Sequence, residues 1–299
     1  MAITLDSIRR VKADQPARIL IYGPPGKGKT TLASEFPDVV FVQIEDGTPG
    51  EGKELASFGL LKTYPQVMQA LNSLLKGVHP YKYVAIDSVT AMQRLVYDET
   101  CYRGDDHGKS KKRIEDFGFG KGYNNATQIW QEYMDMINRL RARGIGTIQI
   151  GHSSISRFDD PEDVSYDRYD LSLRTSDKTD SDHRGVIIRD MDAVLLLKEA
   201  VSIKNEERGP TAKRAIGTGG GTIWIHARSK PALNAKNRYG IPEKGIFKEG
   251  QGYEYLSKYL PAAPGVPQIE SAGGRAAEEV SEDEADYHDE HAEDEDAAA

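Results

Sequence analysis

Short apolar runs recur along the chain, with helical patterns between some of them. Such runs are typical of strands in a parallel sheet, which are buried on both faces and lack the alternation of a half-exposed strand. Strands that alternate with helices predict an α/β fold with a mainly parallel central sheet flanked by helices. The predicted strands are Arg18–Tyr22, Val39–Ile44, Tyr83–Asp87, Gly146–Gly151, Ala193–Lys198 and Thr222–Ala227.

The clearest helical pattern lies between Ala126 and Arg143. Its apolar positions recur at three- and four-residue spacing: Ile129, Trp130, Tyr133, Met136, Ile137 and Leu140. We expect Asn124 or Asn125 to cap its start and Gly144 to end it in the left-handed conformation. Weaker patterns predict further helices at Thr30–Glu35, Gln66–Lys76 and Ala91–Thr100.

Two connections, residues 102–123 and 153–190, are too long to be simple links. Long polar loops inside a compact domain are usually functional or disordered. We divide the chain into an N-terminal segment at 1–15, a domain at 16–260, and a Pro/Gly/Ala-rich linker followed by an acidic tail at 261–299.

Charge is distributed unevenly. The 299-residue chain has a net charge of −8, but residues 275–299 hold twelve acidic side chains and one Arg, a local charge of −11. Subtraction leaves about +3 for the rest of the chain, a slightly basic body. A tail of this composition buries too little apolar surface to fold alone, so we expect disorder. It either aids solubility, competes with nucleic acid for the basic body, or docks a partner.

Several classes of protein are disfavoured by composition. No apolar stretch approaches the 18 residues or so of a membrane span, and the N-terminus lacks the apolar run of a secretory signal. Cys101 is the only cysteine, which excludes an intrachain disulfide framework and a Cys-based zinc cluster. We therefore expect a cytoplasmic protein with no membrane partner.

Residues 23–30, Gly-Pro-Pro-Gly-Lys-Gly-Lys-Thr, match the pattern of a phosphate-binding loop. Its glycines let backbone N–H groups point at phosphate oxygens, and the following helix adds its positive end. We expect Lys29 to reach the β- and γ-phosphates and the Thr30 hydroxyl to ligate Mg²⁺. The chain is therefore interpreted as a P-loop nucleoside triphosphatase that uses MgATP or a similar nucleotide. The predicted nucleotide-binding residues are Gly23, Pro24, Pro25, Gly26, Lys27, Gly28, Lys29, Thr30 and Thr31.

Two acidic residues follow buried strands. Asp87 ends the run YVAID, the Walker B pattern, which places it near the metal ion, commonly through water. An ordinary turn Asp is the alternative. Glu45 follows the strand after the P-loop helix and can orient or deprotonate the attacking water. It could instead cap a turn, and Asp46 competes for the role.

Three further residues are candidates for catalysis. His152 stands at another strand end, where a polar side chain could sense the γ-phosphate, or could be an ordinary structural histidine. Lys236 and Arg238 lie two apart, so on an extended segment they face the same way. They could neutralise charge on a transferring phosphoryl group, in cis or from a neighbouring subunit, or form a solvated basic edge.

Together these segments resemble a RecA-like ATPase core. The run YVAIDSVTAM is very similar to the RecA pattern, and the chain most resembles phage RecA-like nucleotide-binding proteins, a group often described as having an AAA domain. Some of these, the Sak-type recombinases, support single-strand annealing. The resemblance covers roughly residues 15–260 and rests on ARILIYGPPGKGKTTLASEFP, VQIEDG, YVAIDSV, IGH, YDRYDLSL and AKNRYGIP.

The resemblance implies roles for these residues. Glu45 would be the water-activating base, Thr30 and Asp87 would form the metal site, and His152 would sense the γ-phosphate. Lys236 and Arg238 would act across a subunit interface in a ring or filament that holds ATP between subunits. The two long connections fall where RecA-like proteins place their DNA-contacting loops.

Only the first connection has the composition of a DNA-binding loop. It interleaves cations with aromatic side chains, a combination suited to phosphates and bases of a single strand. A mobile, solvated loop is the alternative. Residues 155–185 hold five basic and nine acidic side chains, which does not suit DNA binding. The predicted DNA-binding residues are Lys109, Lys111, Lys112, Arg113, Phe117, Phe119 and Lys121.

The leading hypothesis is an ATP-hydrolysing, single-stranded-DNA-binding protein of phage-type recombination, whose turnover rises on DNA. Its expected partners are single-stranded DNA, further copies of the chain and a single-strand DNA-binding protein, and its expected cofactors are ATP and Mg²⁺. If the gene belongs to a phage, the location is the host cytoplasm. The alternatives are a ring-forming ATPase of the helicase-loader kind and a small P-loop kinase.

Overall fold

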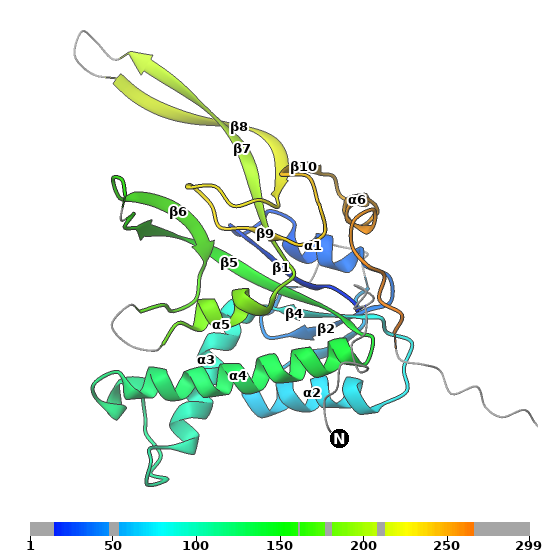
Figure 1. The fold of residues 1–299 in the computed structure, drawn as a ribbon, viewed down its shortest axis with the longest axis vertical. Helices are drawn as coiled ribbons and strands as arrows, with labels where there is room; N and C mark the ends of the chain where they lie inside the picture. Colours follow the sequence, from blue (N-terminus) through cyan, green and yellow to red (C-terminus); the bar gives the residue numbers. More distant parts are fainter. Residues whose placement is uncertain (1–14, 48–53, 161, 177–180, 208–212, 266–299) are drawn as a thin grey trace, which may run out of the picture. The chain divides into compact units, whose positions relative to one another are not determined.

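The computed structural model describes residues 15–47, 54–160, 162–176, 181–207 and 213–265. The N-terminal segment and the acidic tail therefore lie outside the described residues, apart from residue 15 and the first residues of the linker. Figure 1 shows helices on both faces of one large sheet. The helices are α1 (Lys29–Ser34), α2 (Tyr64–Lys76), α3 (Val89–Arg103), the 3₁₀ helix η2 (Ile114–Phe117), α4 (Lys121–Ala142), α5 (His183–Asp190) and α6 (Gly252–Ser257).

The strands form a sheet in the order β10-β8-β7-β1-β5-β4-β2-β3, with β6 beside β5 and β9 beside β7. Neighbours from β7 to β3 in this order are parallel, whereas β8, β10, β6 and β9 pair antiparallel. The strands are β1 (Arg18–Gly23), β2 (Val39–Gln43), β3 (Ser57–Leu60), β4 (Tyr83–Asp87), β5 (Gly146–Phe158), β6 (Tyr166–Leu171), β7 (Ala193–Glu207), β8 (Lys213–His226), β9 (Lys236–Asn237) and β10 (Lys244–Phe247). The predicted α/β class and mainly parallel sheet are confirmed.

Two cores, one on each face of the sheet, explain the continuous apolar runs. Along β1, Leu20 and Tyr22 pack into the core beneath α2, α3 and α4, while Ile19 and Ile21 pack into the core beneath α1 and α6. All four side chains are fully buried. A strand covered on both faces has no polar face to expose, so its sequence does not alternate.

The predicted caps of α4 are partly wrong. The helix begins at Lys121, five residues before the expected start, and its N-cap is Gly120 in the left-handed conformation, so Asn124 and Asn125 lie inside the first turns. Glycine reaches this conformation without a Cβ clash, and the cap therefore needs no side-chain acceptor. Gly144, with φ of 97°, does follow the helix in the left-handed region, as predicted.

The two long connections contain more regular structure than expected. Residues 153–190 include the outer half of β5, all of β6 and α5, so part of this region is an antiparallel β-hairpin. Residues 102–123 include the end of α3, η2 and the start of α4. The loop between Arg103 and Lys121 is called the α3–α4 loop below.

Candidate nucleotide-binding site

The phosphate-binding loop joins the end of β1 to the start of α1. Gly26 and Gly28 have φ of 68° and 77°. A Cβ added at Gly28 would lie 2.6 Å from the Phe247 ring, so this position combines a left-handed backbone with close packing. The loop conformation and the helix that follows it both match what a phosphate cradle requires.

Lys29 is a buried ammonium group whose bonding capacity is mostly unused. It is 6% exposed, and its Nζ donates to the Pro24 carbonyl over 2.9 Å. No other partner lies within hydrogen-bond distance among the described residues. Burial lowers the pKa of Lys29, and the nearby Asp87 and Glu45 carboxylates oppose that shift. A buried cation with free donors is stabilised by an anion, which a phosphate group would supply.

Asp87 lies beside the hydroxyl of the first helix. Thr30 Oγ1 donates to Asp87 Oδ2 over 2.7 Å. Burial raises the pKa of Asp87, while the Thr30 hydrogen bond opposes that change. The peptide bond between Asp87 and Ser88 is cis.

The fit of this pair to Mg²⁺ can be judged from the donor set. In the described part of the chain, no group of three His, Cys, Asp or Glu side chains could hold a metal ion by itself. Mg²⁺ commonly binds through one or two protein oxygens together with nucleotide phosphates and waters. One hydroxyl and one carboxylate beside a phosphate loop fit that pattern, and Thr30 and Asp87 are the residues that would hold the ion.

Glu45 lies between two polar side chains. Its Oε1 accepts a short hydrogen bond from Ser88 Oγ, and its Oε2 lies 3.1 Å from His152 Nε2. The hydrogen bond with His152 lowers the pKa of Glu45, although partial burial acts against it. The neighbouring Asp46 is exposed and makes no hydrogen bond within the described residues. The structure therefore separates the two candidates for the base, since only Glu45 is held by its neighbours.

Sheet order explains why these residues meet. Strand β5 lies between β1 and β4, with Gly23 opposite His152, and β4 lies beside β2, with Asp87 opposite Gln43. The ends of four neighbouring parallel strands thus bring the loop, His152, Asp87 and Glu45 to one edge. The Asp87 carbonyl also accepts from the backbone N–H groups of Ile44 (2.7 Å) and Glu45 (3.1 Å), which fixes the Glu45 backbone.

Comparison with known protein families matches residues 15–239 to the AAA domain family. The match covers about three quarters of the chain. The chain belongs to the AAA domain family. It is accordingly a nucleotide-binding ATPase, and the loop at residues 23–30 with its polar neighbours is where this family member would hold its nucleotide. A comparison with curated proteins gave no match.

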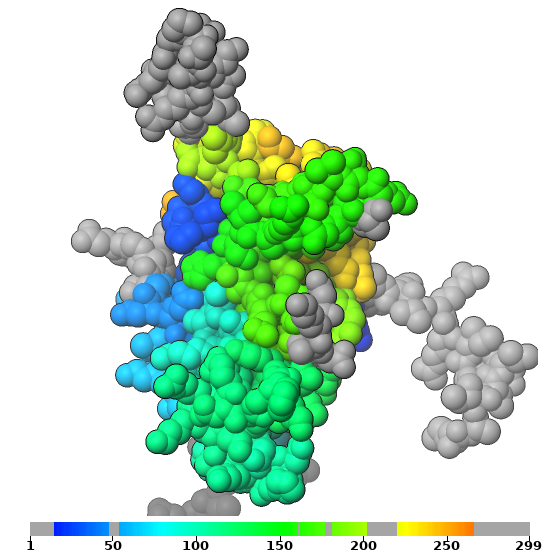
Figure 2. Space-filling view, turned by 90° about the vertical axis from the view of Figure 1, so that its left-hand side faces the viewer, coloured from blue at the N-terminus to red at the C-terminus, as the bar shows by residue number. Residues whose placement is uncertain are grey.

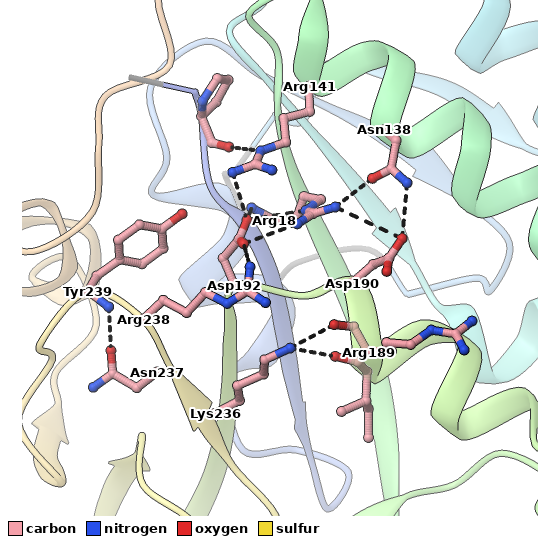
Figure 3. A network of polar contacts seen from close by, with 12 residues as sticks. Arg18, Asn138, Arg141, Arg189, Asp190, Asp192, Lys236, Asn237, Arg238 and Tyr239 are labelled. Atoms are coloured by element: carbon pink, nitrogen blue, oxygen red, sulfur yellow. Dashed lines mark hydrogen bonds and ion pairs between the residues drawn. The ribbon is translucent and has the colours of Figure 1, made fainter. Parts of the chain in front are cut away.

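Lys236 and Arg238 of this AAA domain protein lie at the opposite edge of the sheet, in the polar network of Figure 3. Lys236 Nζ donates to the Arg189 and Ile188 carbonyls at 2.7 and 3.3 Å. Arg238 Nη1 binds Asp192 Oδ1 at 2.8 Å, although its side chain stays half exposed. Both cations extend to the same side of their segment, and each is engaged by its own chain.

Asp192 is the centre of that network. It is 1% exposed and faces Arg18, Arg141 and Arg238. Burial alone would raise the pKa of Asp192, but the hydrogen bonds and charge of Arg18 outweigh it, so the pKa lies below the usual range. Arg18 begins β1 and Gly23 ends it, a span of roughly 17 Å at about 3.3 Å per residue. Arg238 therefore cannot reach the phosphate loop of its own chain, and the cis role considered from the sequence is wrong for it.

The residues predicted to bind DNA divide into two groups. Lys111 forms an ion pair with Asp105 at 2.6 Å and lies over the half-buried Phe117 ring, so both help to hold the loop. Phe119 is fully exposed. The remaining cations are exposed and form no ion pair within the described residues: Lys109, Lys112, Arg113 and Lys121.

Three contributors to the site were not recognised from the sequence. Ser88 binds Glu45, the Thr90 hydroxyl accepts from the His152 N–H over 2.9 Å, and Glu199 forms an ion pair with the P-loop residue Lys27. Ser88 and Thr90 follow the Walker B strand and could have been suspected from that position. Glu199 could not, because 172 residues separate it from Lys27.

None of the helices in the described part of the chain combines the length and the apolar character that crossing a membrane requires. The cytoplasmic location remains a prediction.

Proposed function

We propose that this ATPase binds single-stranded DNA through the α3–α4 loop and that the bound nucleotide controls this grip. The observation that carries the proposal is Phe119, which is 100% exposed at a loop tip among exposed cations. Exposing a large aromatic ring to water is unfavourable unless a ligand covers it. A base stacked on the ring, with phosphates near Lys112, Arg113 and Lys121, would satisfy both kinds of group.

Contacts within the chain hold the loop in its conformation. Asp105 holds Lys111 by an ion pair, and Asp116 Oδ2 accepts from the Arg113 N–H over 3.0 Å. Phe119 has φ of 47° and stands between two left-handed glycines, Gly118 and Gly120. A non-glycine residue in that region is uncommon and mildly strained, which fits a tip shaped to present its side chain.

The loop and the phosphate site share one side of the molecule. Figure 2 shows this side, with the blue surface of the early chain, the green β5–β6 hairpin and the blue-green α3–α4 loop all facing the viewer. A ligand strand on this face would pass within reach of elements that also contact the nucleotide site. This arrangement supports control of DNA binding by nucleotide.

A continuous set of contacts supports that control. The backbone carbonyl of His152, whose side chain meets Glu45, accepts from the Ser172 N–H over 2.8 Å. Two residues later, the Arg174 guanidinium lies 3.5 Å above the Tyr123 ring, and the Tyr123 hydroxyl donates to Glu115 at 2.7 Å in the α3–α4 loop. A shift of His152 towards a γ-phosphate would thus reach the loop through these contacts.

Hydrolysis is assigned to the residues at the phosphate edge. We assign Glu45 as the base that orients and deprotonates water, with Ser88 and His152 holding its carboxylate. Thr30 and Asp87 would hold a bound Mg²⁺, which would neutralise negative charge on the phosphates. Lys29 would donate to phosphate oxygens from within the loop.

Lys236 and Arg238 are proposed to act on the nucleotide of a neighbouring subunit. Arg238 is half exposed, and Asp192 would keep Arg18 and Arg141 as partners if Arg238 turned away. The distance from its own phosphate loop supports a role in trans within a ring or filament. Such an oligomer would hold one DNA strand along many subunits, which would suit single-strand annealing and recombination. A single-strand DNA-binding protein is the proposed further partner.

DNA binding is tested with a fluorescent oligonucleotide and Phe119→Ala. Loss of one stacked base costs about 1–3 kcal/mol, so affinity should fall roughly five- to 150-fold. The matched control is Phe58→Ala, since Phe58 is also an exposed aromatic residue but lies on β3. If wild-type protein does not bind the oligonucleotide with or without ATP, the proposal fails.

The phosphate contacts are tested with the double variant Lys112→Ala/Arg113→Ala. The slope of log affinity against log salt should flatten by about 1.4, the value for two phosphate contacts on a single strand. Lys258→Ala is the control, because Lys258 is an exposed cation beyond α6. An unchanged slope would remove these two residues from the DNA surface.

Coupling is tested with Arg174→Ala. The variant should keep DNA binding and basal ATPase activity but lose most of the stimulation of turnover by DNA. Full stimulation in this variant would contradict the contact route through Tyr123.

A further inference from the structure

A cavity of about 570 Å³ adjoins the phosphate loop on the side away from Glu45 and Asp87. One wall is the loop itself, at Gly26, Gly28 and Thr31. The other wall is β8 and β10, including Ile223 and Ile246. Pockets of this size hold ligands such as nucleosides.

Sheet order gives the direction in which a nucleotide would lie. From β1, the residues around Glu45 lie towards β5, β4 and β2, whereas β8 and β10 lie in the opposite direction, beyond β7. A nucleoside triphosphate with its terminal phosphate beside the Glu45 group must extend its sugar and base away from that group. The cavity lies in that direction.

The lining has the character of a base-binding surface. Ile246 is 47% exposed, and Ile223 is partly exposed, so two apolar side chains remain uncovered at this wall. Thr222 and Lys248 add polar groups at the same cavity. Apolar side chains with a few polar groups suit the flat faces and polar edges of a nucleobase.

Two contacts tie this wall to the phosphate loop. The buried Phe247 ring packs so closely on Gly28 that a Cβ there would meet it at 2.6 Å. Glu199 binds Lys27 of the loop and also accepts from the Gly221 N–H of β8 over 3.1 Å. The wall and the cradle are therefore held in a fixed relation, as two halves of one ligand site need to be.

We propose that this cavity receives the nucleoside part of the nucleotide, with the base against Ile223 and Ile246. The β8 part of this wall lies within the AAA domain match, and the β10 part lies beyond residue 239, where the match ends. The proposal requires nucleotide binding at the loop but not DNA binding, and it holds or fails independently of the α3–α4 loop.

The test compares MgATP with inorganic tripolyphosphate, which has the phosphates but no nucleoside. Ile246→Ser should lower the affinity for MgATP about tenfold, because apolar contact with the base is lost. The affinity for tripolyphosphate, measured by competition, should stay within about twofold of the wild-type value. Val78→Ser is the control, because Val78 is an exposed apolar residue outside this cavity. Unchanged MgATP affinity, or an equal loss for both ligands, would overturn the assignment.

A second measurement does not depend on a variant. Wild-type protein is irradiated with 8-azido-ATP, and labelled peptides are identified by mass spectrometry. Label within residues 221–224 or 246–249, removed by excess ATP, is expected. Label confined to other segments would overturn the assignment.

Discussion

The two edges of the sheet each gather charged side chains, but they use them differently. At the amino-terminal edge, three arginines converge on Asp192, and the buried carboxylate is fully paired. At the carboxyl-terminal edge, the buried Lys29 donates to one carbonyl of its own loop. The first cluster is complete within the chain, whereas the second has donors to spare.

This difference separates a buried carboxylate that is paired within the chain from a buried cation that still lacks an anion. A buried charge costs several kcal/mol unless it is paired, so removing one partner from a paired cluster destabilises the fold. An incompletely paired ammonium beside a curled backbone instead gains partners when an anion binds. Charge density alone does not tell the two edges apart, whereas the number of paired groups at each edge does.

The largest expected effect is on nucleotide binding in Lys29→Ala. Loss of the buried ammonium should reduce MgATP affinity by about two orders of magnitude or more, because charged hydrogen bonds to phosphate contribute about 1.5–3 kcal/mol each. Isothermal titration calorimetry measures this. Lys27→Ala is the control within the same loop, since Lys27 has a carboxylate partner in Glu199. Equal losses of MgATP affinity in the two variants would contradict the distinction between the paired Lys27 and the incompletely paired Lys29.

Glu45→Gln should keep MgATP binding and lower turnover by about 10²–10⁴, the usual contribution of a general base. Asp46→Asn is the matched control one residue along, exposed and without a hydrogen bond among the described residues. Phosphate release under saturating ATP checks both. Full turnover in Glu45→Gln would remove Glu45 from the base role.

The amino-terminal edge should respond in stability. Arg18→Ala removes two side-chain hydrogen bonds to buried Asp192 but leaves Arg141 and Arg238 as partners, so it should lower the free energy of unfolding by about 1.5–3 kcal/mol. Arg238→Ala should cost about 1 kcal/mol or less, because its half-exposed pair is screened by solvent. Urea denaturation compares them. A similar cost for both would mean that Arg238 is a structural residue, and would weaken its proposed role in trans.

The smallest effect is on the pH dependence of stability. The pKa of Asp192 is lower in the folded chain than in the unfolded one, so its pairing stabilises the fold above the unfolded pKa of about 3.9. That contribution disappears as pH falls through the folded pKa. The difference in unfolding free energy between wild type and Asp192→Asn should therefore be largest near neutral pH and shrink below about pH 4. If the difference in unfolding free energy grew as the pH fell, the pKa of Asp192 would be raised by folding and not lowered.

The sequence predicted those elements whose determining interactions lie close together along the chain. Strands β1, β2 and β4 were predicted closely because both faces are buried, and the phosphate loop because its chemistry is contiguous. Edge strands such as β3, which is exposed along its whole length, and the two-residue β9 carry no comparable signal. Polar residues can also extend a strand, so the outer half of β5 was taken for loop.

Contacts between distant residues could not be predicted at all. The approach of β10 to the phosphate loop depends on Phe247 packing against Gly28, more than 200 positions away. The partner of Arg238 depends on how β9 aligns beside β7. In the linear pattern, Lys236 and Arg238 looked like two free cations, and only the register of these strands gives each a partner.

Nucleotide bound at the phosphate loop is proposed to control DNA binding at the α3–α4 loop. The most direct measurement is the affinity of Glu45→Gln for a fluorescent single-stranded oligonucleotide, without nucleotide and with saturating MgATP, which this variant should bind without turnover. Linked binding sites typically differ by about 1–3 kcal/mol between states, so MgATP should change DNA affinity by roughly five- to 150-fold. The same affinity in both conditions, with MgATP binding verified, would contradict the account.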